Sequence, residues 1–285
     1  MKNNIIIVGG SGQLGQCLNE IVARTARKFN FVFLSRTDLD CINSEQAKTI
    51  FELYHPVYCI NCAAYTAVDN AEDDQENAFA VNQFAVRTLA EYCLEYKTTL
   101  IHISTDFVFD GSSSIPLVEM QATSPVNVYG LSKLKGEQEI QSILKEYYIL
   151  RTSWLYSEKS NNFVKTMLKL AQSRKELSVI YDQVGTPTYA MDLALVILNI
   201  TANDPKVYGI YHFSNEGVAS WYDFAKAVFE LAKIDMKVLP VSSAAFVTKA
   251  KRPHFSVLDK TKIKTALGID IPYWRDSLKE CIQKL

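Results

Sequence analysis

The fold is decided by the stretch Asn4-Ile5-Ile6-Ile7-Val8-Gly9-Gly10-Ser11-Gly12-Gln13-Leu14-Gly15. Its first part is a short apolar run rich in β-branched residues, which predicts a buried parallel strand. Glycines follow directly, and helix-like sequence then continues to about Arg27. The glycines fit a dinucleotide-binding fingerprint in two registers, because such residues permit a tight turn and let the backbone approach a pyrophosphate at a helix N-terminus. An ordinary glycine-rich turn is the alternative.

Strands and helices alternate over the next 140 or so residues. The expected strands lie at 31–34, 57–61, 99–103 and 148–152, and the expected helices at 44–54, 75–96 and 129–145. Asn43-x-x-Gln46 resembles a capping box at the start of the first of these helices. The alternation predicts an α/β fold with a Rossmann-like, doubly wound parallel sheet.

The second half of the chain is less regular. Helix-like segments lie at 163–172, 191–200 and 221–232, and residues 207–213 have strand character. We expect a dinucleotide-binding domain over residues 1–155 and a smaller, mainly substrate-binding C-terminal domain over residues 156–285. Residues 187–203 are expected to pack back on the sheet of the first domain.

Composition excludes several classes of protein. A chain of 285 residues with 48% hydrophobic content can bury a large core, and a net charge of −1 gives no basis for nucleic-acid binding. No apolar run approaches the ~20 residues of a membrane span, so we expect a cytoplasmic protein. The pair Cys59-x-x-Cys62 lies in an apolar run without a second pair or a His cluster, which indicates buried thiols and predicts no metal site.

Tyr129 and Lys133 provide a candidate acid–base pair. Residues four apart on a helix share one face, and a cation near a phenol stabilises the phenolate and lowers its pKa. Such a pair can exchange a proton with an oxygen on a substrate carbon. The alternative is a packed ring beside a solvated ammonium group.

Other candidates follow the ends of predicted strands, where ligands bind in open α/β sheets. Ser104 and Thr105 offer hydroxyl groups after the fourth strand. The second strand ends at Arg36, with Asp40 slightly later; an arginine here favours NADPH over NADH because it accommodates the 2′-phosphate, with NADH as the alternative cofactor. Asn82 lies inside a predicted helix, where an asparagine usually faces solvent or is satisfied locally.

Taken together, the motifs resemble the dTDP-4-dehydrorhamnose reductase family of the extended short-chain dehydrogenase/reductase superfamily. The matching segments span nearly the whole chain and comprise Gly12–Gly15, Asn61–Asp69, Ser104–Gly111, the Tyr129-x-x-x-Lys133 pair, Arg151–Trp154, Asn162–Met167, Trp221–Phe224 and Arg252-Pro253. One departure is Phe107, where many relatives have tyrosine, and it removes a hydroxyl that could contact substrate.

The resemblance implies a reaction and a set of roles. NADPH, or NADH, would reduce the C4 keto group of dTDP-4-dehydro-β-L-rhamnose to give dTDP-β-L-rhamnose. Tyr129 would be the general acid, Lys133 would lower its pKa and bind the nicotinamide ribose, and Thr105 would hydrogen-bond the carbonyl oxygen. The implied cofactor contacts are Gly9, Gly12, Gln13, Leu14, Arg36, Asp40, Ala63, Ala64, Tyr65, Asn82, Ser104, Tyr129 and Lys133. The implied substrate contacts are Thr66, Val68, Thr105, Asp106, Trp154 and Arg252.

Two other functions stay open at this point. A nucleotide-sugar epimerase or dehydratase would share the fold, the tyrosine and the lysine but would keep its NAD bound through a cycle. A non-catalytic regulatory subunit, like the β subunit of methionine adenosyltransferase, would resemble the same family. A nucleotide-sugar substrate is the expected partner, neither nucleic acid nor membrane is expected, and the sequence is compatible with a homodimer.

Overall fold

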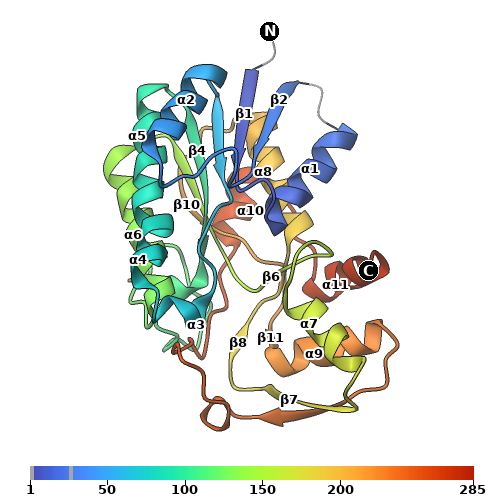
Figure 1. The fold of residues 1–285 in the computed structure, drawn as a ribbon. Helices are drawn as coiled ribbons and strands as arrows, with labels where there is room; N and C mark the ends of the chain where they lie inside the picture. Colours follow the sequence, from blue (N-terminus) through green and yellow to red (C-terminus); the bar gives the residue numbers. More distant parts are fainter. Residues whose placement is uncertain (1–2, 26–27) are drawn as a thin grey trace.

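The computed structural model describes residues 3–25 and 28–285, and its centre is a six-stranded sheet in the order β10-β5-β4-β3-β1-β2 (Figure 1). All neighbouring strands in it are parallel. The predicted α/β fold with a Rossmann-like sheet is therefore confirmed. The strands are β1 (Asn3–Val8), β2 (Phe29–Leu34), β3 (Tyr58–Asn61), β4 (Thr99–Thr105), β5 (Tyr147–Thr152) and β10 (Gly209–His212).

Helices cover both faces of the sheet, and β1 shows why. Side chains alternate along a strand, so Ile5 and Ile7 pack in one core cluster with α1 and α8, and Ile6 and Val8 pack in another with α2 and α5. Figure 1 shows these two layers on opposite sides of the strands. The helices concerned are α1 (Gln13–Thr25), α2 (Ser44–Tyr54), α5 (Ala85–Glu95), α6 (Val128–Ile143) and α8 (Ala190–Asn203). The expected extension of the first helix to Arg27 lies outside the described residues.

The start of α2 differs from the predicted capping box in one respect. Asn43 caps the helix as expected, since its side chain accepts hydrogen bonds from the backbone N–H groups of Glu45 and Gln46. The Gln46 side chain accepts instead from the N–H of Asp40, at 2.9 Å. The reciprocal half of the box was therefore a wrong prediction, because a nearby loop offers Gln46 another donor.

The predicted helix 75–96 is interrupted by a π-helical segment. It consists of α4 (Gln75–Phe79), the π-helical η1 (Ala80–Phe84) and α5, and a short helix α3 (Val68–Ala71) precedes it. Within η1 the backbone carbonyl of Asn82 meets Gly136 of α6, where an added Cβ would lie 2.2 Å from that oxygen. The wider turn and the glycine together let two backbones come into close contact, and such π segments often occur at functional sites.

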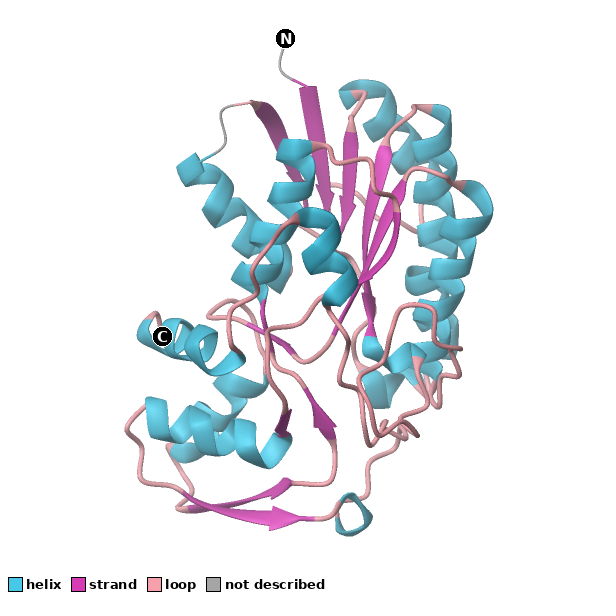
Figure 2. Ribbon diagram, turned by 180° about the vertical axis from the view of Figure 1, so that it is seen from behind, coloured by secondary structure: helices cyan, strands magenta, loops and turns pink. Residues whose placement is uncertain are grey.

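The second half of the chain forms a lobe beyond the carboxyl ends of the sheet strands (Figures 1 and 2). The two-stranded sheet of β7 and β12 lies along its lower edge, with α7 and α9 packed together above it. β10, which comes from this half, joins the central sheet beside β5. The division at residue 155 stays a prediction. The elements of the lobe are β6 (Leu155–Tyr156), α7 (Phe163–Ala171), β7 (Glu176–Ile180), β8 (Val184–Gly185), β9 (Thr188–Tyr189), β11 (Ala219–Ser220), α9 (Trp221–Leu231), β12 (Lys237–Val241), η3 (Ser243–Ala245) and α11 (Trp274–Gln283). The helix α10 (Thr261–Leu267) packs instead against β10 of the central sheet.

The cysteines are free thiols, and those of the Cys59-x-x-Cys62 pair have separate surroundings. Cys59 is fully buried in β3 and hydrogen-bonded to Cys93, whereas Cys62 is half-buried, and burial raises its pKa. Thiols with raised pKa values are poor nucleophiles and metal ligands. Within residues 3–25 and 28–285, no helix has the length and apolar character needed to cross a membrane.

Candidate active site

Three segments that the sequence singled out meet at one edge of the sheet. Val8 at the end of β1 is the register partner of Asn61 at the end of β3, and Asn61 is in turn the partner of His102 in β4. The glycine loop, residues 62–66 and the end of β4 therefore lie side by side. The strand order also reverses here, between β1 and β3, which is where open α/β sheets bind ligands.

The glycine loop lies directly against the backbone that follows β3. Gly9 has a φ of +78°, which glycine adopts without strain, and an added Cβ would lie 2.7 Å from the backbone nitrogen of Ala63. Gly12 donates a 3.0 Å hydrogen bond to the Gly9 carbonyl, and α1 begins at the next residue. Any larger residue at Gly9 would separate the loop from β3.

A cavity of about 280 Å³ opens between these segments. Glycine and alanine residues line one part of it, larger side chains such as Leu39 and Tyr65 line another, and the exposed Arg36 lies at its side. A helix N-terminus behind a glycine turn suits a pyrophosphate, and small residues leave room for a flat ligand, so the donors present fit a dinucleotide. The predicted cofactor residues that line this cavity are Gly9, Gly12, Arg36, Asp40, Ala63, Ala64 and Tyr65.

Other predicted cofactor residues have their side chains engaged elsewhere. Leu14 is buried in the core beneath α1. Ser104 donates a 2.5 Å hydrogen bond to the buried carboxylate of Glu137. Asn82 accepts from the N–H of Tyr65 and donates to its carbonyl, and it also donates to Ser132. Asn82 thereby fixes the loop after β3 against α6, and the cofactor contacts of all three residues stay predictions.

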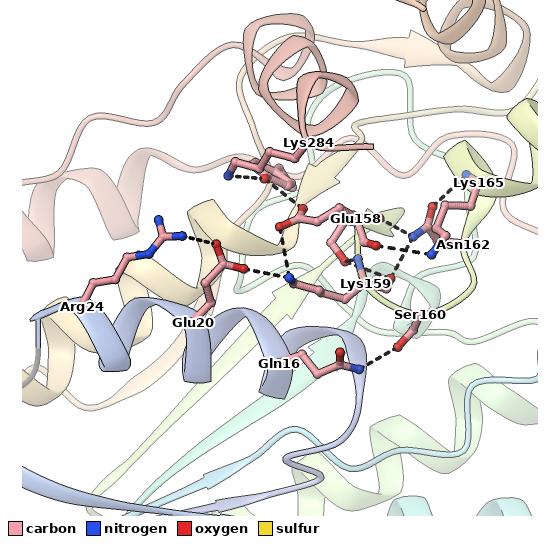
Figure 3. A network of polar contacts seen from close by, with 11 residues as sticks. Gln16, Glu20, Arg24, Glu158, Lys159, Ser160, Asn162, Lys165 and Lys284 are labelled. Atoms are coloured by element: carbon pink, nitrogen blue, oxygen red, sulfur yellow. Dashed lines mark hydrogen bonds and ion pairs between the residues drawn. The ribbon is translucent and has the colours of Figure 1, made fainter.

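Gln13 connects the start of α1 to the second half of the chain. Its side chain donates to the Leu155 carbonyl at 3.1 Å and accepts from Asn162, the N-cap of α7, at 2.8 Å. Farther along α1, Glu20 pairs with Lys159 at 2.8 Å. Figure 3 shows the Glu20–Lys159 pair and the hydrogen bond from Gln16 to Ser160, which connect α1 to the loop that precedes α7. The residues around the predicted pyrophosphate site are thus bonded to the lobe.

Tyr129 lies in the first turn of α6, and its ring is half-buried. It packs edge-on against Phe107, with ring centroids 5.7 Å apart. Burial raises the pKa of Tyr129 to about 12, although a hydrogen bond with Thr105 acts in the opposite direction. The expected lowering of this pKa by Lys133 is therefore wrong for this structure, because burial disfavours the phenolate.

Lys133 is buried one helical turn farther along α6. Its Nζ donates to the Ile103 carbonyl at 2.7 Å and lies 3.2 Å from Nε2 of His102. Burial lowers the pKa of Lys133 to about 8, opposed by the negative charge of Glu137. A lysine with a pKa this close to neutrality can exchange its proton at the pH of a cell.

Asp106 follows Thr105 at the end of β4 and is buried. Thr105 donates a 3.0 Å hydrogen bond to its Oδ1, whereas Oδ2 has no hydrogen-bond partner among the described residues. Burial raises the pKa of Asp106 to about 6. An unsatisfied buried carboxylate oxygen is costly, so this atom is suited to a ligand hydroxyl.

A second cavity, of about 580 Å³, lies between α7, α9 and the segment around Arg252. Arg252 forms a bidentate pair with Asp69, with the shorter bond at 2.5 Å. Asp69 also lines this cavity, next to the half-buried Val68, and Thr66 is exposed nearby in sequence.

Trp154 is a further predicted substrate contact, and it stacks face to face on Trp221, a residue that lines this larger cavity.

Several residues near the proposed site were not predicted from the sequence. His102 and Glu137 carry polar groups that contact Lys133 or Ser104, and both are completely buried. A polar residue inside an apolar strand, as His102 is, was the available signal. Phe163 and Trp221 line the larger cavity, and only the family motifs had drawn attention to them.

Comparison with known proteins identifies the family. The model of the RmlD substrate binding domain matches residues 1–285. The chain belongs to the RmlD substrate binding domain family. It is similar to a dTDP-4-dehydrorhamnose reductase from Aggregatibacter actinomycetemcomitans, with 41% identity over 96% of this chain and 97% of the relative. The resemblance predicted from the motifs is confirmed.

Solved structures of the family have the same fold. A dTDP-4-dehydrorhamnose reductase from Bacillus anthracis, in complex with NADP, superposes with a TM-score of 0.95 at 36% identity and covers 100% of both chains. A UDP-glucose 4-epimerase from Thermus thermophilus, in complex with NAD, gives a TM-score of 0.84 over 98% of each chain, but only 18% identity. The second likeness shows the fold alone.

Proposed function

We propose that this chain is an NADPH-dependent dTDP-4-dehydrorhamnose reductase, which reduces the C4 keto group of dTDP-4-dehydro-β-L-rhamnose to the hydroxyl of dTDP-β-L-rhamnose. The observation that carries the proposal is its 41% identity, over nearly its full length, to a reductase of that name. A chemical basis comes from Thr105, the last residue of β4, which hydrogen-bonds Tyr129 at the edge of the sheet that also carries the glycine loop.

The smaller cavity is the proposed cofactor site. When bound there, NADPH supplies the hydride that reduces the carbonyl carbon. The glycine loop and the N-terminus of α1 hold the pyrophosphate, and Ala63 and Ala64 leave room beside β3. Arg36 lies at the side of the cavity, where a guanidinium suits the 2′-phosphate of NADPH. The family member from Bacillus anthracis has NADP bound, which supports the same choice here.

Tyr129 is the proposed general acid. Because burial raises its pKa to about 12, the hydroxyl is protonated at neutral pH and can donate its proton to the C4 oxygen as negative charge develops there. The Thr105 hydroxyl, which hydrogen-bonds Tyr129, would turn from Asp106 to the substrate and act as the second donor toward that oxygen. Lys133, one helical turn farther along α6, is the proposed contact of the nicotinamide ribose.

The larger cavity is the proposed site of the nucleotide sugar. Arg252 offers a guanidinium to the diphosphate, and a bidentate pair is a geometry that it already adopts with Asp69. Aromatic side chains on α7 and α9, Phe163 and Trp221, provide flat apolar surface for a base. Trp154, Val68 and Thr66 are the remaining proposed contacts on the cofactor side.

The direct test is an assay of the purified chain with dTDP-4-dehydrorhamnose and either NADPH or NADH. We expect one equivalent of NADPH to be oxidised per equivalent of dTDP-rhamnose formed, with NADPH preferred. An epimerase would isomerise a nucleotide sugar without net oxidation of cofactor, and a regulatory subunit would show no turnover. Either result would overturn the proposal. A homodimer and a cytoplasmic location stay predictions from the sequence.

A further inference from the structure

Asn61, His102 and Lys133 form a buried polar chain beneath the proposed site. They come from the end of β3, from β4 and from α6, and they are 3%, 0% and 1% exposed. Asn61 Nδ2 lies 3.1 Å from His102 Nδ1, and His102 Nε2 lies 3.2 Å from Lys133 Nζ. Each buried polar group in this chain has few possible hydrogen-bond partners. Which atom donates and which accepts in each hydrogen bond can therefore be derived.

The backbone N–H of Ala63 fixes which atoms of this chain donate and which accept. Ala63 N–H can only donate, and it lies 3.1 Å from Asn61 Oδ1, which is therefore the acceptor. This contact fixes the amide so that Nδ2, a donor, faces His102 Nδ1. Nδ1 must accept, and a neutral imidazole that accepts at Nδ1 carries its proton on Nε2. Burial, followed by the charge of Lys133, lowers the pKa of His102 well below its ordinary value, so the ring is neutral at pH 7.

We infer that His102 is a positioning residue for Lys133: Asn61 holds its imidazole as the Nε2–H tautomer, which presents a donor rather than an acceptor to the Lys133 amine. The inference rests on the proposed function only for the role of Lys133. A donor on this side of Nζ offers no acceptor to the ammonium protons. One of them is donated to the Ile103 carbonyl, 2.7 Å away.

Other groups around Lys133 act on its charge as well. Glu137 lies one turn farther along α6 and favours the ammonium form, but its carboxylate is held by Arg151 at 2.6 Å. Cys62, after β3, also favours the ammonium form. The charge of Asp106 acts on the pKa of Tyr129, whereas the charges that act on the pKa of Lys133 are those of Glu137 and Cys62. Among the described residues, two groups hydrogen-bond Nζ: the Ile103 carbonyl, which accepts from the ammonium, and His102, which as the Nε2–H tautomer disfavours the charged amine.

His212 provides an internal reference for the tautomer. It is also completely buried, and its Nδ1 lies 2.9 Å from the Leu117 carbonyl, which can only accept. His212 must therefore carry its proton on Nδ1, the opposite of His102. Burial lowers its pKa to about 3, so it too is neutral at pH 7. One protein thus holds both neutral tautomers in comparable surroundings.

The first test is ¹⁵N NMR of histidine-labelled protein at pH 7, prepared without nucleotide and assigned with a His102→Gln variant. We expect His102 to show the Nε2–H pattern and His212 the Nδ1–H pattern. In Asn61→Asp, one carboxylate oxygen still accepts from Ala63 and the other accepts from the ring, so the His102 pattern should invert to Nδ1–H. An Nδ1–H or doubly protonated His102 in the unmodified protein would overturn the inference.

The second test is the pH profile of kcat for His102→Gln. Its side-chain oxygen can accept from Nζ and favours the ammonium form, so we expect the alkaline limb to move up by about one pH unit. His55→Asn is the matched control, because His55 is exposed at the C-cap of α2, at the opposite edge of the sheet. If the alkaline limb of the pH profile stayed in place in His102→Gln, or moved equally in His55→Asn, His102 would not be a positioning residue for Lys133. The NMR result is independent of turnover, so it distinguishes failure of this inference from failure of the proposed reaction.

Discussion

The indole rings of Trp154 and Trp221 stack with centroids 3.6 Å apart and an angle of 9° between their planes. Trp154 follows β5 of the central sheet, and Trp221 is the first residue of α9 in the lobe. The Trp154 backbone has a φ of +48°, a conformation that a bulky residue rarely adopts. The stack therefore connects the segment after β5 to the larger cavity at the cost of local backbone strain, which is typical of functional positions.

The stack predicts a fluorescence response to nucleotide. Trp221 lines the larger cavity, so dTDP bound there should change the emission of the stacked pair. We expect titration with dTDP to quench tryptophan fluorescence, and Trp221→Phe to lose most of the change and to bind dTDP several-fold more weakly. Tyr222→Phe, a neighbour on α9 outside the cavity lining, is the control. A full response in Trp221→Phe would place the nucleotide elsewhere.

Tyr129→Phe should separate chemistry from binding. The variant keeps the ring that packs on Phe107 but loses the acidic proton, so kcat should fall by on the order of 10²-fold or more. The affinity for NADPH, measured by fluorescence titration, should change little. Thr105→Val is the companion variant, and we expect a smaller loss of kcat from it because one donor to the developing charge remains. Normal turnover by Tyr129→Phe would remove this residue from the mechanism.

Arg252→Lys should weaken binding of the nucleotide sugar without slowing the reaction itself. Lysine keeps the positive charge but lacks the fork that pairs with two oxygens at once, as Arg252 does with Asp69. We expect KM for the nucleotide sugar to rise roughly tenfold, with kcat within a few-fold of the unmodified protein. Arg275→Lys, which alters an exposed pair with Glu230, should leave both constants unchanged. A rise confined to the KM for NADPH would assign Arg252 to the other cavity.

Local sequence patterns were sufficient to predict the scaffold. The apolar runs at Ile5–Val8 and Leu100–Ile103 predicted buried strands, and the glycines after Val8 predicted a tight turn into a helix. The spacing of Tyr129 and Lys133 placed them in successive turns of α6. These features depend on neighbours in the chain, and propensity and periodicity describe such neighbours well.

Contacts between distant residues were beyond those patterns. Lys133 bonds to Ile103 and His102 rather than acting directly on the Tyr129 hydroxyl, because the sheet edge brings β4 beneath α6. Arg252 pairs with Asp69, which is 183 residues away in sequence. Spacing along the sequence cannot identify partners that only the tertiary fold brings together. The direction of the Tyr129 pKa shift was likewise unpredictable, because it depends on how deeply the fold buries that side chain.

The buried histidines predict how stability depends on pH. His212 has a pKa of about 3 in the folded chain, lowered first by burial and then by Arg151, compared with about 6.5 when unfolded. Between these values the unfolded chain binds a proton that the folded chain does not, so stability falls as pH decreases below about 6.5. His102 adds a contribution of the same sign. Asp106, whose pKa is raised to about 6, acts in the opposite direction between about pH 6 and pH 4 and offsets only part of the loss.

His212→Gln tests this account, because glutamine can keep a hydrogen bond to the Leu117 carbonyl but does not titrate. For the unmodified chain we expect the free energy of unfolding, from urea denaturation, to decrease between pH 7 and pH 5. In His212→Gln this decrease should be smaller by about 2 kcal/mol, the free energy of protonating one unfolded histidine over that interval. Replacing the exposed His55 by asparagine provides the comparison. Equal losses of stability in His212→Gln and the unmodified chain over these two pH units would contradict this account. The folded chain would then protonate the His212 imidazole as readily as the unfolded chain does, despite its burial between Arg151 and Phe109.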